Sequence, residues 1–251
     1  MAGTLGIKLS RVAIMVAVFA LWEILSRTGI VNPRLLPPAS DALTTLWELL
    51  QRASVRNDLA VTASEVLVAF ILAVPCGLAI GFMIAENRYF AEVAKPLLFF
   101  AFSIPKSIFL PMFILVFGVG FSQKVGFGFF STIFIVIMST TTAVESVKVD
   151  HLTVARSYGA TPMQTACRIY LPCMLPVLLE ALRISMIFNL TGVILAEMYA
   201  SRDGIGHQIA TWGENFQMRQ LLAGVLMIAA IAVTFNELVR LVETRCSHWR
   251  T

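Results

Sequence analysis

Long apolar runs alternate with short polar connections along the chain, and this pattern predicts six membrane-spanning helices. A span needs about 20 consecutive, mostly apolar residues. Six stretches approach or reach that length, and they are residues 12–31, 66–85, 97–121, 125–144, 173–196 and 221–239. The pattern therefore predicts an all-α, polytopic membrane protein.

A few charged residues interrupt the apolar runs, and each has to be explained. Glu23 and Arg27 lie four positions apart with the acid first, a spacing that favours an ion pair on a helix. Lys106 is the one charge in the third run, between Pro105 and Pro111. A charge near the bilayer centre costs about 3 kcal/mol or more, so we expect Lys106 to face a cavity, a partner subunit or a polar backbone break.

Two candidates for a permeation pathway follow from these charges, and each has a structural alternative. Lys106 is either a pathway residue or a donor to carbonyl groups that the two neighbouring prolines leave free. Glu197 ends the fifth run, and we expect its carboxylate to touch water at the membrane interface, with a gate residue as the alternative.

The connections between the runs predict three local structures. Residues 32–40 contain three prolines and cannot be helical. A short amphipathic helix should follow, with Ser40 or Asp41 as its cap. Its apolar face would consist of Leu43, Leu46, Leu49 and Leu50. Segment 148–172 predicts two short helices broken at residues 159–162, with Thr161 as a cap and Pro162 at the first helical position.

Composition agrees with a chain whose main solvent is lipid. Of 251 residues, 58% are hydrophobic and 14% are charged, and the mean hydropathy is +0.81, whereas soluble domains contain roughly 25% charged residues. The net charge of +4 is too small and too scattered for a nucleic-acid surface. With both termini in the cytoplasm, the inner segments hold more Lys and Arg than the outer ones, among which we count Lys124, as the positive-inside rule requires.

We expect no enzyme activity and no metal site in this chain. The three histidines are far apart, the four cysteines have no metal-ligand spacing with them, and no HExxH, GxSxG or GxxxxGK[ST] motif occurs. The glycine-rich stretch 118–128 has the wrong spacing for a nucleotide loop and predicts a tight external turn with close helix packing. If ATP drives transport, ATP and Mg²⁺ should bind to another polypeptide, and this chain should bind no cofactor.

The sequence VARSYGATPMQTACRIYLPCMLP at residues 154–176 resembles the cytoplasmic motif EAA-x3-G-x9-I-x-LP of ABC importer membrane subunits. Five residues match it: Ala155, Gly159, Ile169, Leu171 and Pro172. Thr153 and Val154 stand where the family has its Glu-Ala pair. The resemblance implies a type I ABC importer permease fold, with a coupling segment that docks on the ATPase subunit. Its expected coupling residues are these five with Thr153, Arg156 and Ala160.

Three further stretches resemble the nitrate, sulfonate and taurine subgroup of these permeases. They are LLPPASDAL at 35–43, IPKSIFLPMFILVFGVG at 104–120 and AEMYASRDGIGHQI at 196–209. The resemblance implies import of a small solute, such as a sulfonate, nitrate or a related organic anion.

The resemblance also implies an organisation and a set of partners. We expect an N-terminal anchor helix and external amphipathic segment in residues 1–60, and a core permease domain in residues 61–245 that contains the cytoplasmic coupling loop 148–172. The expected partners are two ATPase subunits, a second copy of this chain and a periplasmic binding protein, in a bacterial inner membrane. The alternatives are an ion-coupled carrier, which would need paired acids at mid-membrane, and a membrane-embedded enzyme or scaffold.

Overall fold

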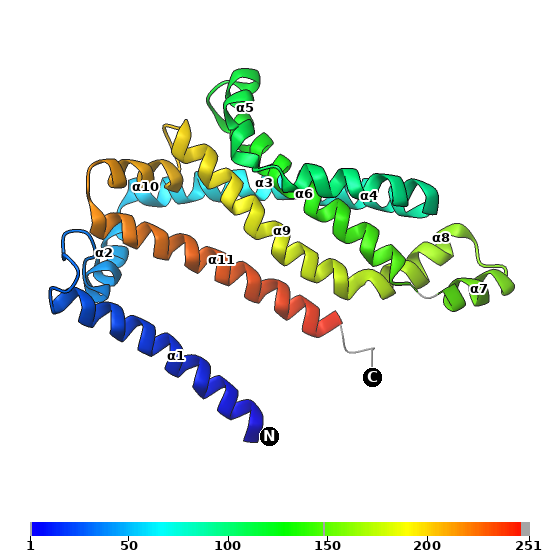
Figure 1. Ribbon diagram of the computed structural model, residues 1–251, viewed down its shortest axis with the longest axis horizontal. Coiled ribbons are helices and arrows are strands. Elements are labelled where there is room, and N and C mark those ends of the chain that lie inside the picture. The colour runs from blue at the N-terminus through cyan, green and yellow to red at the C-terminus, as the bar shows by residue number, and fades with distance from the viewer. Residues whose placement is uncertain (1, 148, 247–251) are drawn as a thin grey trace.

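The protein is a bundle of long helices, described here from a computed structural model that covers residues 2–147 and 149–246 (Figure 1). No strand occurs in these residues. The helices are α1 (Ala2–Arg27), α2 (Ala39–Gln51), α3 (Ala53–Glu86), α4 (Arg88–Ser103), the 3₁₀ turn η1 (Lys106–Phe109), α5 (Leu110–Phe117), α6 (Phe121–Glu145), α7 (Val149–Ser157), α8 (Pro162–Thr165), the π-helical turn η2 (Ala166–Tyr170), α9 (Leu171–Tyr199), α10 (Ile205–Glu214) and α11 (Met218–Cys246).

Five helices of the described chain are long and apolar enough to cross a membrane, and a bent pair provides a sixth candidate. The five are Leu9–Arg27, Ala53–Glu86, Phe121–Glu145, Met163–Tyr199 and Met218–Leu241. The bent pair joins Arg88–Ser103 to Lys106–Phe117 at an angle of 78°. Each of the six expected spans therefore corresponds to one of these candidates, and the third corresponds to the bent pair.

The break in the third span lies at Ile104 and Pro105, whose backbones are extended rather than helical. A residue before proline is pushed out of the α region by the proline ring, and proline itself has no N–H to donate. Pro111, by contrast, lies in the first turn of α5, where a missing N–H breaks no helical hydrogen bond.

The centre of the bundle is formed by α3, α6 and α9, which pack at very short range. A Cβ atom added at Gly81 of α3 would lie 2.6 Å from Thr140 Cβ of α6. A Cβ atom at Gly128 of α6 would lie 2.7 Å from Val193 Cγ2 of α9. Small residues at such positions let helix backbones approach closely in lipid, and the close packing expected of the glycine-rich stretch 118–128 is confirmed at Gly128.

Helix α1 extends away from the other long helices and is attached only near its end (Figure 1). The Glu23–Arg27 ion pair is present at 2.6 Å, as predicted. Glu23 also accepts hydrogen bonds from the Ser40 N–H at 3.0 Å and the Ser40 hydroxyl at 2.9 Å. The carboxylate of Glu23 therefore fixes the start of α2 against the end of α1.

The predicted cap and apolar face of α2 are partly wrong. The cap residue is Pro38, with no side-chain cap bond, because the Ser40 hydroxyl bonds to Glu23 instead. Leu49 is fully buried, with Leu46 and Leu50 packed around it. Leu43 is 49% exposed, so it does not belong to the buried face.

Candidate functional site

The segment between α6 and α9 forms two helices joined by a glycine turn. Gly159 has a φ of +70°, a left-handed conformation that glycine adopts without steric cost. The Ala160 N–H donates to the Ala155 carbonyl at 3.0 Å, which closes the end of α7. The predicted break between the two short helices is confirmed, and Gly159 lies at its turn.

Helix α8 begins with a reciprocal capping pair. The Gln164 N–H donates to the Thr161 hydroxyl at 3.3 Å, and the Thr161 N–H donates to Gln164 Oε1 at 2.9 Å. This is a capping box, in which each side chain satisfies a backbone N–H that has no helical partner. Thr161 is therefore the cap, and Pro162 is the first helical residue, as expected.

The second helix does not end at Pro172, the last residue of the segment 148–172 in which we expected two short helices. The helix continues from α8 through η2 into α9, so that Met163–Tyr199 is one span candidate of 37 residues. Proline in a helix removes one hydrogen bond and clashes with the carbonyl four residues before it. The π-helical turn at Ala166–Tyr170 widens the helix just before Pro172, which accommodates the proline without ending the helix.

The residues predicted from the motif divide into packed and exposed positions. Ala155 is buried, and Ile169 packs against the cluster of Val144, Val147, Met174 and Leu178. Thr153, Gly159 and Leu171 are exposed, and Ala160 and Pro172 are half-buried. The side chain of Arg156 lies outside the described residues, as does all of residue 148.

Three of the exposed large apolar side chains of this segment belong to residues that do not match the motif. Tyr158 is 88% exposed and Met163 is 73% exposed, on either side of the Gly159 turn, with Val154 at 55% nearby. We call Val154, Tyr158 and Met163 the apolar rim. Comparison with the family motif did not identify the apolar rim, because it considered only the residues that match the motif. Apolar residues on both sides of a glycine turn were a signal that could have identified this rim.

Lys106 lies at the break between α4 and α5 and lines a cavity of about 340 Å³. Its Nζ atom lies 4.2 Å from the centre of the Phe102 ring and 5.6 Å from that of Phe188. Within the described residues Nζ donates no hydrogen bond to a carbonyl group, so the aromatic faces are its attractive contacts. The other lining residues include Ser131, Thr191 and Gly192, so the charge faces a mixed apolar and hydroxyl-lined space.

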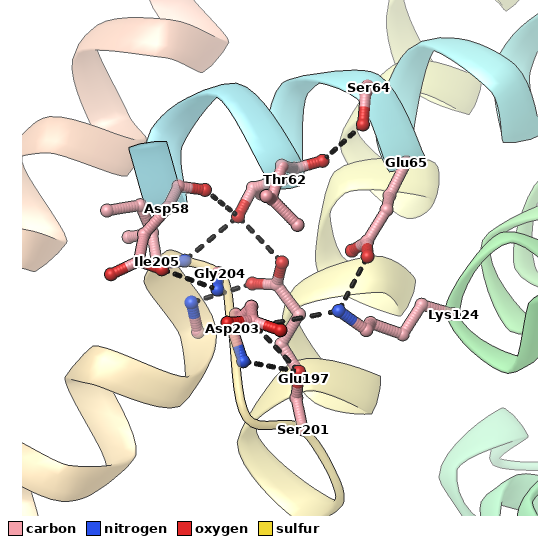
Figure 2. A network of polar contacts seen from close by, with 12 residues as sticks. Asp58, Thr62, Ser64, Glu65, Lys124, Glu197, Ser201, Asp203, Gly204 and Ile205 are labelled. Atoms are coloured by element: carbon pink, nitrogen blue, oxygen red, sulfur yellow. Dashed lines mark hydrogen bonds and ion pairs between the residues drawn. The ribbon is translucent and has the colours of Figure 1, made fainter. Parts of the chain in front are cut away.

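Glu197 is fully buried, so the expectation that its carboxylate touches water is wrong. One oxygen accepts from the Thr62 hydroxyl at 2.6 Å and the other from the Gly206 N–H at 2.7 Å. Figure 2 shows the Glu197 carboxylate between α3 and the turn that leads into α10. The carboxylate is buried because α10 folds back over the end of α9 and brings the Gly206 N–H to it.

A buried ion pair lies beside Glu197, and it contains Lys124, which we count among the charges of the outer segments. Lys124 Nζ lies 2.5 Å from Glu65 Oε1, and both side chains are almost completely buried. Lys124 Nζ also reaches the Asp203 carbonyl oxygen at 3.5 Å. The ion pair joins Glu65 of α3 to Lys124 of α6. It lies next to Glu197, which joins α9 to α3 (Figure 2).

Sequence reasoning missed Asp58, Thr62 and Glu65 because it began the second span at residue 66. The three residues are spaced by four and three positions, which places them on one face of a helix. Helix α3 does begin earlier, at Ala53. A polar face that leads directly into an apolar run was the signal that could have found them.

Comparison with known proteins agrees with these features. A profile described as "Binding-protein-dependent transport system inner membrane component" matches residues 73–248, which include the glycine turn, α9 and α10. The chain belongs to this family. It is an ABC transporter permease with apolar, membrane-spanning helices.

Two curated relatives are similar over almost the whole permease. The taurine transport system permease protein TauC of Escherichia coli (strain K12) is 25% identical over 240 residues, which cover 94% of this chain and 87% of TauC. The aliphatic sulfonates transport permease protein SsuC of Bacillus subtilis (strain 168) is 25% identical over 233 residues, which cover 93% and 84%. The resemblance to the sulfonate and taurine subgroup is confirmed.

Solved structures show the same fold. A chain of a bacterial ABC transporter involved in the import of the acidic polysaccharide alginate superposes with a TM-score of 0.67 at 14% identity, covering 96% of this permease and 99% of that chain. A chain of the inward-facing MetNI methionine ABC transporter gives 0.57 at 18% identity, covering 83% and 95%. The predicted type I ABC importer permease fold is confirmed.

Proposed function

We propose that this permease is the membrane subunit of an ATP-driven importer that moves a small organic anion into the cytoplasm. The observation that supports this most directly is the coupling segment 148–172, whose exposed glycine turn is flanked by the apolar rim (Val154, Tyr158 and Met163). Exposed apolar side chains on a turn favour a protein partner. Two ATPase subunits, which bind ATP and Mg²⁺, would be those partners.

Two observations support the class of solute that we propose: the names of the relatives and the cavity at Lys106. TauC and SsuC are named for taurine and aliphatic sulfonates. The cavity brings one ammonium group to a space with few other charges, which suits a compact anion and disfavours a cation. A sulfonate of taurine size is therefore the solute class we propose, with nitrate as a smaller relative.

The assembly we propose pairs this chain with a second copy and with a periplasmic binding protein. Helix α1 begins and α11 ends toward the side of the bundle that holds α7 and α8 (Figure 1). With the coupling segment in the cytoplasm of a bacterial cell, both termini face inward and α10 faces the periplasm. Residues 1–60 would then act as an anchor and external segment, and residues 61–245 as the permease domain.

The test is co-expression of this chain with the ATPase and binding protein encoded beside it, followed by reconstitution in vesicles. We expect ATP-dependent uptake of taurine.

We also expect that the double variant Tyr158→Ala and Met163→Ala lowers co-purification of the ATPase by about tenfold, because two large apolar contacts are lost from the interface. Tyr199→Ala is the matched control, since Tyr199 is 71% exposed but lies at the opposite end of α9.

Two results would contradict the proposal. One is normal co-purification of the ATPase by the double variant. The other is taurine uptake by vesicles that contain the permease alone and depend on an ion gradient, which would favour the ion-coupled carrier.

A further inference from the structure

Three successive N–H groups at the start of α10 are held by side chains of two other helices. The Gly204 N–H donates to Asp58 Oδ1 at 3.1 Å, the Ile205 N–H to the Thr62 hydroxyl at 2.9 Å, and the Gly206 N–H to Glu197 Oε2 at 2.7 Å. Asp58 and Thr62 belong to α3, whereas Glu197 belongs to α9. We call these three side chains and residues 204–206 the α10 clamp (Figure 2).

The clamp depends on glycine at both ends of its turn. Gly204 has a φ of +103°, and a Cβ atom there would collide with the Glu197 carboxylate. A Cβ atom at Gly206 would lie 2.7 Å from Glu197 Cβ and 2.7 Å from the Ile194 carbonyl oxygen. The glycines therefore allow α10 to approach α9 within direct hydrogen-bonding distance of its carboxylate.

Helix α9 links the clamp directly to the coupling segment. It contains 29 residues, which at 1.5 Å per residue is a rod of roughly 43 Å. The π-helical turn and α8 continue it into the coupling segment at one end, and Glu197 lies two residues from its other end. One continuous helical path, with Pro176 and the π-helical turn along it, therefore joins the clamp to the glycine turn.

Stability alone gives no reason to bury this many charged groups. Burial of a carboxylate or an ion pair costs solvation free energy, and the hydrogen bonds and ionic contacts that the buried group makes roughly offset this cost. An apolar side chain of similar size at the same place often gives a protein of equal stability. Asp58, Glu65, Lys124 and Glu197 are all buried within this one region. Directional hydrogen bonds, unlike apolar contacts, fix α10 in one orientation on α3 and α9.

We propose that Glu197 is a positioning residue through which a protein bound against α10 acts on α9 and so on the coupling segment. This inference rests on the proposed function, in which that protein is the periplasmic binding protein. The clamp transmits the docking event, so binding-protein stimulation of ATP hydrolysis requires it. Basal hydrolysis by the assembled complex does not.

The decisive variants are two glycine substitutions in the same helix. Gly206→Ala inserts a methyl group between α10 and Glu197, whereas Gly213→Ala meets only the flexible end of Leu221, at 3.2 Å. In the reconstituted complex with taurine-loaded binding protein, we expect Gly206→Ala to lower the stimulated-to-basal ratio of ATP hydrolysis about tenfold, within the usual range of coupling between sites. Gly213→Ala should keep the native ratio.

Two substitutions in the clamp separate its hydrogen bonds from its charge. Glu197→Gln can still accept from the Gly206 N–H and can donate to the Thr62 hydroxyl, so it should keep most of the stimulation. Thr62→Val deletes the hydroxyl that Glu197 and Ile205 share, with little change in volume, and should lose stimulation as Gly206→Ala does. It replaces Gly206→Ala in the test if that variant does not assemble.

The outcomes distinguish this inference from the function on which it rests. A native complex that the binding protein does not stimulate overturns the proposed function itself. A stimulated native complex together with equal stimulation of Gly206→Ala or Thr62→Val overturns the clamp alone. The clamp is also wrong if these variants lower basal and stimulated hydrolysis by the same factor, because that result indicates only damage to the fold.

Discussion

At the scale of single residues, a charge in an apolar helix must have a partner or a cavity, and this chain contains both solutions. Lys124 has a carboxylate partner in Glu65. Lys106 has two aromatic rings and an open cavity. A lysine with a buried counter-ion is neutralised where it lies, whereas no carboxylate of the described residues pairs with Lys106, so an anionic ligand could be its counter-ion. Lys106 is therefore the pathway candidate that we favour over the buried Glu197.

Lys106→Met should separate a pathway role from a structural one. Methionine is almost as long as lysine and can pack against Phe102 and Phe188, but it carries no charge. We expect taurine uptake to fall about tenfold or more, since a hydrogen bond to a charged group contributes roughly 1.5–3 kcal/mol. Thermal stability and basal ATP hydrolysis should remain native, and Lys106→Arg should keep most of the uptake. Native uptake with a lowered melting temperature would instead indicate that the lysine stabilises the break.

At the scale of elements, local rules predicted the spans, the proline break, the Thr161 cap and the Gly159 turn, because each depends on residues within one or two turns of helix. The α10 clamp could not be predicted in this way. The hydrogen bond from Thr62 to Glu197 joins residues 135 positions apart, and no spacing rule relates them. The π-helical turn was also missed, since it reflects how a long helix accommodates Pro172 rather than a preference of residues 166–170.

The glycine turn of the coupling segment gives the sharpest prediction at this scale. Gly159→Val places a β-branched residue at a φ of +70°, which costs about 1–2 kcal/mol or forces the turn to change. The turn between α7 and α8 would then move the apolar rim. We expect the six spans to insert normally, while ATPase co-purification or the ratio of uptake to hydrolysis falls severalfold.

Gly120→Val is the matched control for that variant. A Cβ atom at Gly120 meets nothing within 4 Å, its backbone is extended, and it lies far along the chain from the coupling segment. Both variants should be compared at equal membrane expression. If Gly159→Val binds the ATPase and transports at the native rate, segment 148–172 is not the coupling element.

At the scale of the whole molecule, the long helices separate two ends with different chemistry. One end has the glycine turn and the apolar rim, and the other has α10, its clamp and the connection that includes Phe216. The proposed function assigns the first end to the cytoplasm and the second to the periplasm. Both termini should lie on the cytoplasmic side, because an even number of spans returns the chain to the side on which it started.

This orientation can be measured with single cysteines in a background where Cys76, Cys167, Cys173 and Cys246 are replaced by serine. Tyr158→Cys and Phe216→Cys report the two ends, because Tyr158 is 88% exposed and Phe216 is 75% exposed. A membrane-impermeant maleimide added to intact spheroplasts should label Phe216→Cys at once. It should label Tyr158→Cys only after permeabilisation, since the reagent cannot cross the apolar core of the bilayer. The serine background provides the unlabelled control. Labelling of Tyr158→Cys in intact spheroplasts would place the coupling segment outside the cell, where no ATPase could reach it.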